Sequence, residues 1–284
     1  MVRLADFIRC STEKLSNIYP QPEARNIVLM LCEEKLGVRP YTHIVEPDRT
    51  VPDGMVCELE DDLRRLLDSE PVQYVLGACE FYGRRFRLDR SVLIPRPETE
   101  LLVREAVTKA MDMPGPVRVL DLCTGSGCIA WSILKEVQDA SVVAVDISED
   151  ALALASGQFP GPGPEFLKAD LLDEIPDVLD RKSFDLIVSN PPYIMEQEKA
   201  SMRPNVLEWE PEIALFVPDE DPLLFYRAIA RWSERLLVPG GYGMVEINET
   251  QGSGVKQVFE GYGFKDVRVI SDYFGKNRFV SFRR

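Results

Sequence analysis

The stretch 117–127 reads Val117-Arg118-Val119-Leu120-Asp121-Leu122-Cys123-Thr124-Gly125-Ser126-Gly127 and decides the fold that we expect for this 284-residue chain. It is a short apolar strand that runs into a glycine-containing turn, and residues 128–134 after it have helical character. Glycines in such a turn let the backbone bend tightly and approach a ligand without a Cβ in the way. The pattern is typical of the strand, turn and helix unit that binds nucleotides.

A second strand is expected over 141–146, and it ends on Asp146. An acid at this place reaches ribose hydroxyls, and one hydrogen bond to a charged acceptor contributes about 1.5–3 kcal/mol. The glycines with an acid about twenty residues on also satisfy the dinucleotide fingerprint, so this pattern alone leaves NAD open beside S-adenosylmethionine. Asp121 favours S-adenosylmethionine, because a carboxylate at the end of the first strand can reach a ligand's ammonium group but repels a pyrophosphate.

The apolar run 184–189 leads directly into Asn190-Pro191-Pro192-Tyr193. Such an exit lies at the carboxyl edge of a sheet, where open α/β sheets bind their ligands. The prolines restrict the backbone, so the Asn190 side chain and the Pro191 carbonyl are held in a fixed geometry. These two acceptors can take both hydrogens of one NH₂ group while Tyr193 lies against its plane. An ordinary surface turn is the alternative for the tetrapeptide alone, but together with the glycine turn it predicts methyl transfer to an amide or amino nitrogen.

With these motifs the chain resembles the protein-(glutamine-N5) methyltransferases that modify peptide-chain release factors. The matching stretches are 70–77, 81–83, 92–100, 121–130 and 189–194, in this order. The resemblance covers roughly residues 70–284, whereas the first seventy residues match mainly in helical character. Other amino-group methyltransferases share the Asn-Pro-Pro-Tyr site, so the segment Pro95-Arg96-Pro97-Glu98-Thr99-Glu100 carries most of the family-level specificity.

The resemblance implies an α/β fold: a Rossmann-like S-adenosylmethionine-dependent methyltransferase domain with a mostly parallel seven-stranded sheet. A small N-terminal helical domain and a β-hairpin linker are expected before it. We expect the helical, substrate-docking domain over 1–78, the linker over 79–96 and the catalytic domain over 97–284. The alternation of strands and helices after residue 117 independently indicates a parallel sheet covered on both faces. Its third strand is expected over 165–170, and the closing segments 265–271 and 278–284 are expected to pair antiparallel. A helix is expected to open at Pro97.

The implied reaction is methylation of the glutamine side-chain nitrogen in the Gly-Gly-Gln motif of class I peptide-chain release factors. S-adenosyl-L-methionine is the expected cofactor and S-adenosyl-L-homocysteine its product. The expected catalytic residues are Asn190, Pro191 and Tyr193. The expected substrate-binding residues are these three together with Pro192, Arg96 and Glu98. The expected cofactor-binding residues are Asp121, Cys123, Thr124, Gly125, Ser126, Gly127, Asp146, Asp170, Leu171 and Asn190.

Several of these residues also have structural interpretations. Asp146 and Asp170 fit the capping of a helix or a turn, and Asp170 fits this role as well as it fits a contact to the adenine amino group. Arg96 and Glu98 fit a junction between a hairpin and a helix. The chain also departs from the family's usual pattern in two places: Cys123 stands where glycine is usual, and the loop 216–223 lacks a glycine-rich turn.

Two competing functions remain at this point. The same Asn-Pro-Pro-Tyr geometry suits an enzyme that methylates the amino group of a flipped adenine or guanine in nucleic acid. The second competitor is a binding protein that keeps the fold without its chemistry, with Cys123 as the possible sign. A net charge of −14 opposes binding to a polyanion, so no direct nucleic-acid binding is expected.

Composition bounds the remaining properties. No apolar run approaches the roughly 18 residues of a membrane span, and the amino terminus lacks a signal-peptide pattern, so a cytoplasmic protein without a membrane partner is expected. The six cysteines form no Cys-x-x-Cys pair and His43 is the one histidine, so no metal is expected. We expect a monomer.

Overall fold

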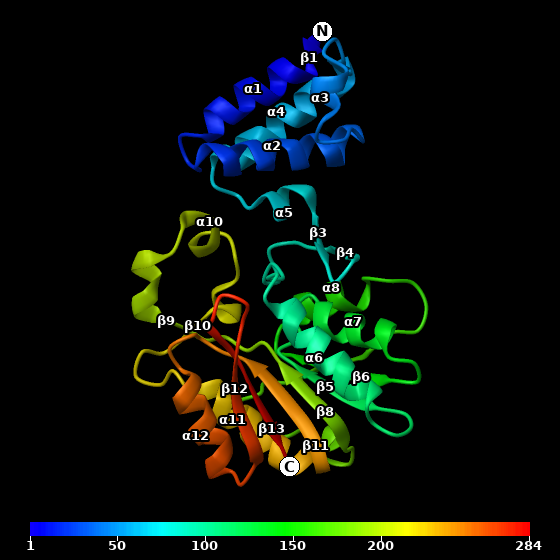
Figure 1. Cartoon of the computed structure of the whole chain (residues 1–284), viewed down its shortest axis with the longest axis vertical. Coiled ribbons are helices and arrows are strands. Elements are labelled where there is room, and N and C mark those ends of the chain that lie inside the picture. Colours follow the sequence, from blue (N-terminus) through cyan, green and yellow to red (C-terminus); the bar gives the residue numbers. More distant parts are fainter. The chain divides into compact units, whose positions relative to one another are not determined.

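The computed structural model describes residues 1–284, which divide into two compact units. The first unit consists of Met1–Ala78 together with Arg203–Trp209. The second consists of Cys79–Met202 and Glu210–Arg284. Figure 1 draws both, with most of the first unit in blue and cyan.

Helices form most of the first unit, as its apolar spacing predicts. They are α1 (Leu4–Leu15), α2 (Gln21–Leu36), α3 (Thr42–Val45), α4 (Asp53–Leu67), α5 (Val72–Leu76) and, from the later segment, α10 (Pro204–Leu207). The short strands β1 (Val2–Arg3) and β2 (Thr50–Val51) pair antiparallel. The apolar stripes of α1, α2 and α4 meet in one core that includes Leu15 and Leu31. Gly37 ends α2 at φ +62°, a conformation that glycine adopts without a Cβ penalty.

The second unit is built on a seven-stranded sheet. Its strands are β5 (Arg118–Leu122), β6 (Ser141–Asp146), β7 (Glu165–Lys168), β8 (Phe184–Ser189), β11 (Leu237–Glu246), β12 (Lys265–Ser271) and β13 (Asn277–Arg283). Their order is β12-β13-β11-β8-β5-β6-β7. The five strands from β11 to β7 are parallel, and β13 runs antiparallel to both of its neighbours. The predicted mostly parallel sheet, closed by an antiparallel pair, is confirmed.

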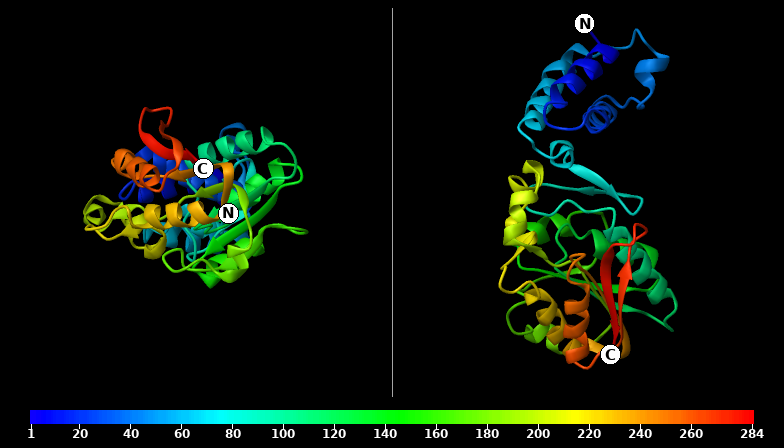
Figure 2. Two further views of the ribbon diagram at one scale, coloured as in Figure 1. Left: turned by 90° about the horizontal axis from the view of Figure 1, so that it is seen from below. Right: turned by 60° about the vertical axis from the view of Figure 1, so that its left-hand side comes forward.

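Helices cover both faces of this sheet (Figures 1 and 2). One face packs against α11 (Leu224–Leu236) and α12 (Gly252–Gly261), and the other against α6 (Thr99–Met111) and α7 (Cys128–Glu136). Alternate residues of each strand therefore enter different cores: in β5, Leu120 and Leu122 pack toward α11 and α12, whereas Val119 packs toward α6 and α7. Burial on both faces explains why the parallel strands read as continuous apolar runs.

Shorter elements complete the chain. They are the paired strands β3 (Ala78–Phe81) and β4 (Arg84–Arg87), the helices α8 (Glu149–Ser156) and α9 (Asp177–Asp180), the 3₁₀ turns η1 (Glu196–Ser201) and η2 (Glu212–Ala214), and the parallel pair β9 (Ile194–Met195) and β10 (Phe216–Val217). No helix of the chain has both the length and the apolar character needed to cross a bilayer.

Two element ends differ from those expected from the sequence. The third strand, expected to reach Asp170, ends at Lys168, because the Asp170 side chain accepts the backbone N–H of Leu172 and forms a turn. The helix expected to open at Pro97 begins at Thr99, whose N–H donates to the Arg96 carbonyl in a preceding turn.

Close packing at Gly243 in β11 gives a first prediction. An added methyl group there would overlap the buried ring of Phe282, its neighbour in β13. We expect Gly243→Ala to lower the free energy of unfolding by about 1–3 kcal/mol in urea denaturation. Gly261→Ala is the control, since a Cβ at Gly261 meets nothing within 4 Å and should change stability by less than about 0.5 kcal/mol. Equal stabilities of the two variants would contradict this packing.

Candidate functional site

A cavity of about 330 Å³ lies at the carboxyl ends of β5, β6 and β8. Most of the residues expected to bind the cofactor line it. These are Cys123, Thr124, Gly125, Ser126, Asp146, Asp170, Leu171 and Asn190, and Pro192 lies in the same wall. The size is within the range of small-molecule sites, which begins at about 300 Å³.

Strand register brings these residues together. Leu122 of β5 is paired with Val145 of β6 on one side and with Ser189 of β8 on the other. The residues that follow these three are Cys123, Asp146 and Asn190. All three therefore lie side by side at the carboxyl edge of the sheet. Their positions in the cavity wall follow directly from the parallel pairing of the strands.

The turn after β5 has a left-handed backbone at three positions. Cys123 has φ +60°, Gly125 φ +54° and Gly127 φ +77°. A Cβ added at Gly125 would meet nothing within 4 Å, so the backbone there is bare toward the cavity. Gly127 does not line the cavity: a Cβ at this position would come within 3.0 Å of Ala155 and 3.1 Å of Trp131. The lack of a side chain at Gly127 thus allows α7 to pack near α8, a role other than the predicted cofactor contact.

Asp121 is fully buried and does not line the cavity either. Its Oδ2 accepts a hydrogen bond from the Thr124 hydroxyl at 2.6 Å, so the carboxylate holds the turn that follows β5. Burial raises the pKa of Asp121 to about 7, although the bond from Thr124 acts in the opposite direction. The contact of Asp121 with a ligand ammonium group stays a prediction.

Asp146 is held at the cavity by two backbone N–H groups. Its Oδ2 accepts from Gly125 at 2.8 Å and its Oδ1 from Ser148 at 3.0 Å. Burial raises the pKa of this carboxyl, and the backbone hydrogen bonds oppose the rise. Each carboxylate oxygen has a second lone pair, so Asp146 can still accept from ligand hydroxyls.

The rest of the wall suits an adenine nucleoside. Apolar side chains from different elements also line this cavity, and they are Ile147, Ala151, Leu171, Leu172 and Phe225. Side chains of this kind can enclose a flat ring, the carboxylate of Asp146 can accept from hydroxyl groups, and Gly125 leaves room for a chain close to the backbone. The residues present therefore fit S-adenosyl-L-methionine.

A second, small cavity of about 40 Å³ adjoins the Asn-Pro-Pro-Tyr segment. Its lining residues are Leu93, Arg96, Asn190, Pro191, Tyr193, Ile194, Ala214 and Leu215. Asn190 belongs to the walls of both cavities. An amide group is thus placed between a nucleoside-sized space and a narrow apolar space beside an aromatic ring.

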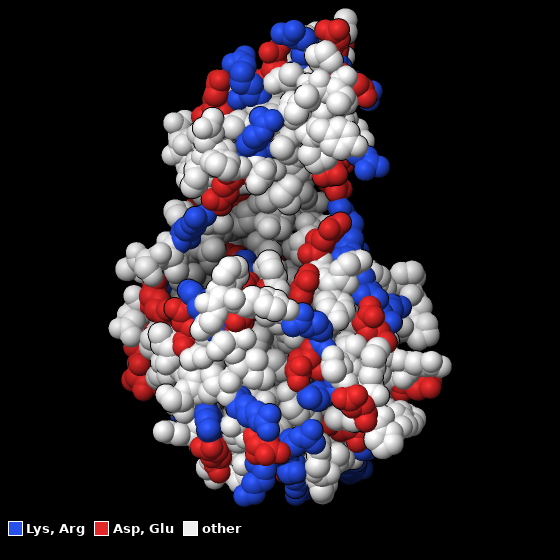
Figure 3. Space-filling view, viewed as in Figure 1, with Lys and Arg blue, Asp and Glu red and all other residues white.

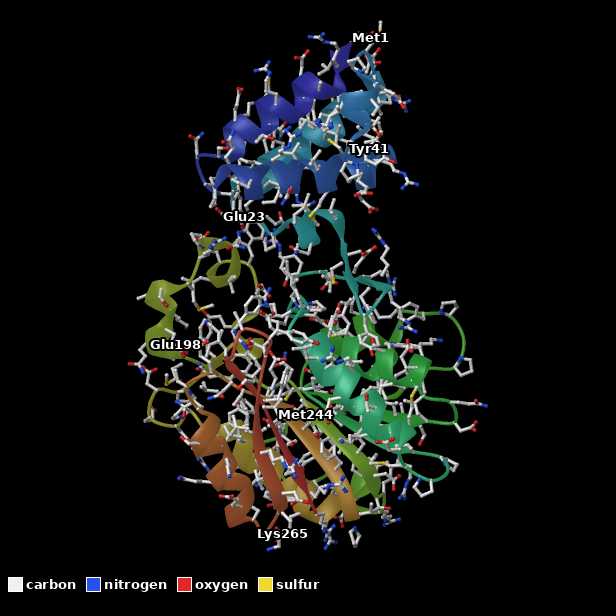
Figure 4. The ribbon with its side chains drawn as sticks, in the orientation of Figure 1. Met1, Glu23, Tyr41, Glu198, Met244 and Lys265 are labelled. Carbon is white, nitrogen blue, oxygen red and sulfur yellow. The ribbon has the colours of Figure 1, made fainter.

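Beneath this segment lies a buried hydrogen-bond network that the sequence did not indicate. Thr99 Oγ1 donates to Glu246 Oε2 at 2.8 Å, and the Tyr193 hydroxyl donates to Glu246 Oε1 at 3.1 Å. Asn190 Nδ2 donates to Thr99 Oγ1 at 3.3 Å. Burial raises the pKa of Glu246 to about 7 and holds that of Tyr193 well above its usual value. Glu246 is the last residue of β11, two residues beyond Met244, which is labelled within the sheet in Figure 4.

Arg96 lines the small cavity and forms an ion pair with Glu210 at 2.6 Å. Glu210 is buried, and its other oxygen accepts the backbone N–H of Ile94 at 3.0 Å. The pair ties the segment before α6 to the loop that closes the small cavity. Glu98 lines neither cavity, so the structure does not place it at the predicted substrate mouth.

The loop without a glycine-rich turn has a regular structure. Phe216–Val217 forms β10, which pairs parallel with Ile194–Met195 of β9 directly after the Asn-Pro-Pro-Tyr segment. The N–H of Ile194 also donates to the Leu215 carbonyl at 2.9 Å. Backbone pairing thus fixes this wall of the small cavity.

Sequence reasoning missed Thr99, Glu246 and Glu210. A signal for Glu246 existed, because an acid that ends a parallel strand follows the same logic as Asp146. Thr99 stands inside the segment that carries the family resemblance, yet nothing in the spacing reveals its partner. Glu210 gives no such signal, since its partners lie more than a hundred residues away in the chain.

Comparisons with known proteins agree with this architecture. The family model "PrmC N-terminal domain" matches residues 6–77 and "Methyltransferase small domain" matches residues 98–207. A release factor glutamine methyltransferase of Bacteroides thetaiotaomicron is 44% identical over 286 residues, which covers all of both chains. The chain belongs to the release factor glutamine methyltransferase family. The predicted resemblance is confirmed, and with it the methyltransferase activity.

Other members and structures extend the finding. The release factor glutamine methyltransferase of Flavobacterium psychrophilum is 35% identical over 272 residues, or 94% of each chain. A crystal structure of a methyltransferase from Pyrococcus furiosus covers 79% of this chain and 98% of its own, with a TM-score of 0.52 and 15% identity. That likeness concerns the fold alone. Membership of the release factor glutamine methyltransferase family also excludes the dinucleotide interpretation of the glycine turn.

The left-handed backbone at Cys123 predicts an unusual order of stabilities. A residue with a Cβ pays about 1–2 kcal/mol in this conformation, which exceeds the roughly 0.4–1 kcal/mol of extra chain entropy that glycine loses on folding. We expect Cys123→Gly to be more stable than Cys123→Ala by about 0.5–1 kcal/mol in urea denaturation. In the helix α7 the order should reverse, with Ser132→Ala more stable than Ser132→Gly. An alanine variant as stable as the glycine variant at 123 would show that no strain is present.

The raised pKa of Glu246 predicts a dependence of stability on pH. The carboxyl titrates near its ordinary value of 4.5 in the unfolded chain and near about 7 in the folded protein. Between these values the folded state binds more protons, so the free energy of unfolding falls as pH rises, by at most about 1.4 kcal/mol per pH unit. Glu246→Gln should remove this contribution, so its stability relative to wild type should rise across the window. Asp121 titrates in both proteins, so its contribution cancels in the difference between them. Parallel curves of unfolding free energy against pH would refute the raised pKa of Glu246.

Proposed function

We propose that the protein methylates the side-chain nitrogen of the glutamine in the Gly-Gly-Gln motif of class I peptide-chain release factors. The observation that carries the proposal is the place of Asn190 in the walls of both cavities. A nitrogen that Asn190 holds in the small cavity faces the nucleoside-sized cavity. Membership of the release factor glutamine methyltransferase family supports the substrate.

S-adenosyl-L-methionine, when bound, supplies a methyl group activated by a positively charged sulfur. Asp146 is the residue that would hold its ribose, and the bare backbone at Gly125 would admit its methionine portion. Leu171 and the other apolar residues of the cavity wall would enclose its adenine.

The substrate amide is a weak nucleophile, because its nitrogen lone pair is delocalised into the carbonyl. Asn190 Oδ1 and the Pro191 carbonyl accept its two hydrogens and draw electron density onto nitrogen. Tyr193 lies against the amide plane and fixes the direction of the lone pair, and such orientation reaches effective molarities of about 10⁵–10⁸ M. The nitrogen gains a methyl group and then releases one of its two protons to water, so no strong base is needed first.

The first unit takes the docking role in this proposal. All residues that line the two cavities belong to the second unit, and the family model that matches residues 6–77 describes an N-terminal domain. A net charge of −14 disfavours nucleic acid as the substrate. On the face of the second unit seen in Figure 3, acidic and basic side chains are interspersed.

Loss of the Asn190 amide tests this mechanism. We expect Asn190→Ala to lower kcat by about 10²–10³-fold, the usual effect of removing one preorganised hydrogen bond at a reacting group, with the affinity for S-adenosyl-L-methionine largely kept. Mass spectrometry of a purified release factor should show one methyl group on the Gly-Gly-Gln glutamine after incubation with wild type. Asn277→Ala, in β13 near the hairpin turn, is the matched control and should retain activity.

Two results would overturn the proposal. Equal turnover by Asn190→Ala would remove the role of the amide. Transfer of a labelled methyl group to DNA or RNA, with none to the release factor, would move the enzyme to the nucleobase class.

A further inference from the structure

Asn190 can serve as an acceptor only when its amide has the right orientation. The oxygen must face the substrate, and the NH₂ group must face away, since an NH₂ group toward the substrate would meet the substrate's own NH₂ group. The two orientations differ by a half-turn of the amide group about the Cβ–Cγ bond. The hydrogen-bond partners of the amide have to select one of them.

The buried network beneath the site makes this selection. Glu246 is 3% exposed and Thr99 2%, so neither has water as an alternative partner. At a pH above its pKa of about 7, Glu246 is a carboxylate and only accepts hydrogen bonds. The Thr99 hydroxyl therefore has to donate its single proton to Glu246 Oε2, which lies 2.8 Å away.

The direction of the Thr99 proton also fixes the hydrogen bond between Thr99 and Asn190. With its proton used, Thr99 Oγ1 can only accept from the amide of Asn190, and the NH₂ end is the end that donates. Asn190 Nδ2 lies 3.3 Å from Thr99 Oγ1, and Oδ1 is left as the end available to a ligand. The orientation of a cavity-lining amide is thus dictated by a carboxylate that lines neither cavity.

The same carboxylate also fixes the aromatic ring. Its other oxygen, Oε1, accepts from the Tyr193 hydroxyl at 3.1 Å. The backbone carbonyl of Glu246 accepts from the Tyr226 hydroxyl of α11 at 3.2 Å, which holds the end of β11 in place. Glu98 and Arg278 are the other charged residues that act on the Glu246 carboxyl, with opposite signs.

We propose that Thr99 and Glu246 are positioning residues for methyl transfer: Glu246 orients Thr99, Thr99 turns the Asn190 oxygen toward the substrate nitrogen, and Glu246 anchors Tyr193. The inference rests on the proposed function for its substrate. Glu246 lines neither cavity, whereas Thr99 stands in the wall of the larger one. Because both residues act through Asn190 and Tyr193, we expect their main effect on the geometry of transfer rather than on binding of the methyl donor.

The test compares Thr99→Val, which keeps the shape and removes the hydroxyl, with Thr99→Ser, which keeps the hydroxyl. At a pH of about 8.5, above the pKa of about 7, we expect Thr99→Val to lower kcat about 10- to 100-fold, since small misplacements of a reacting pair cost up to about 10²-fold. The KM for the release factor and the Kd for S-adenosyl-L-methionine should change less than kcat. Thr99→Ser should restore most of kcat. Thr108→Val, an exposed threonine on the same helix whose hydroxyl bonds to the Arg104 carbonyl, is the matched control.

A second variant, Glu246→Gln, keeps the inference testable if Thr99→Val fails to fold. Glu246→Gln buries no charge and should fold, but a carboxamide both donates and accepts, so it no longer dictates the direction of the Thr99 proton. Its kcat should also fall while donor binding persists. Wild-type kcat in either folded variant, Thr99→Val or Glu246→Gln, would overturn the inference and leave the proposed function intact.

A readout without turnover separates this inference from the proposed function. The side-chain NH₂ signals of Asn190 can be assigned by nuclear magnetic resonance from their loss in Asn190→Asp. We expect these protons to exchange with water more slowly in wild type and Thr99→Ser than in Thr99→Val. Equal exchange in all three proteins would overturn the inference whatever the substrate is. A wild-type enzyme that leaves the release factor unmodified, yet shows the expected exchange, would instead count against the proposed function alone.

Discussion

Parallel backbone pairing at the centre of the sheet is the constraint on which the site depends. Leu122 lies opposite both Val145 and Ser189, and Ser189 in turn lies opposite Val245. The next residue in each of these four strands therefore stands in one row at the carboxyl edge, and this row reads Glu246, Asn190, Cys123 and Asp146 across the sheet. A shift of any strand by one residue would turn its functional side chain toward the opposite face.

The acids in this row and within β5 are of two kinds. Asp146 is tied to backbone N–H groups at the cavity wall and keeps lone pairs for a ligand. Glu246 and Asp121 are buried instead, and each has a threonine hydroxyl as donor, Thr99 in one case and Thr124 in the other. Burial of an acid costs free energy, and in both cases a hydrogen bond from a threonine to the carboxylate offsets part of this cost.

The sequence predicts those parts of the site that depend on strand ends and on local turns. Asp146 and Asn190 end apolar runs, and Gly125 stands in a recognisable turn. For Asp121 the sequence predicts the position near the end of β5 but not the burial of its side chain or its bond from Thr124, which depend on how the following turn folds back over the strand. The contacts of Glu246 depend on packing between segments far apart in the chain, which no local pattern contains.

Cys123 brings a sulfur atom into the wall of a cavity suited to an alkylating cofactor. A thiolate there would compete with the substrate as a nucleophile and would inactivate the enzyme by capturing the transferred group itself. Burial raises the pKa of this thiol far above its free value, and the nearby acids Asp146 and Asp121 raise it further. A raised pKa disfavours the thiolate and with it the alkylation of this partly buried cysteine.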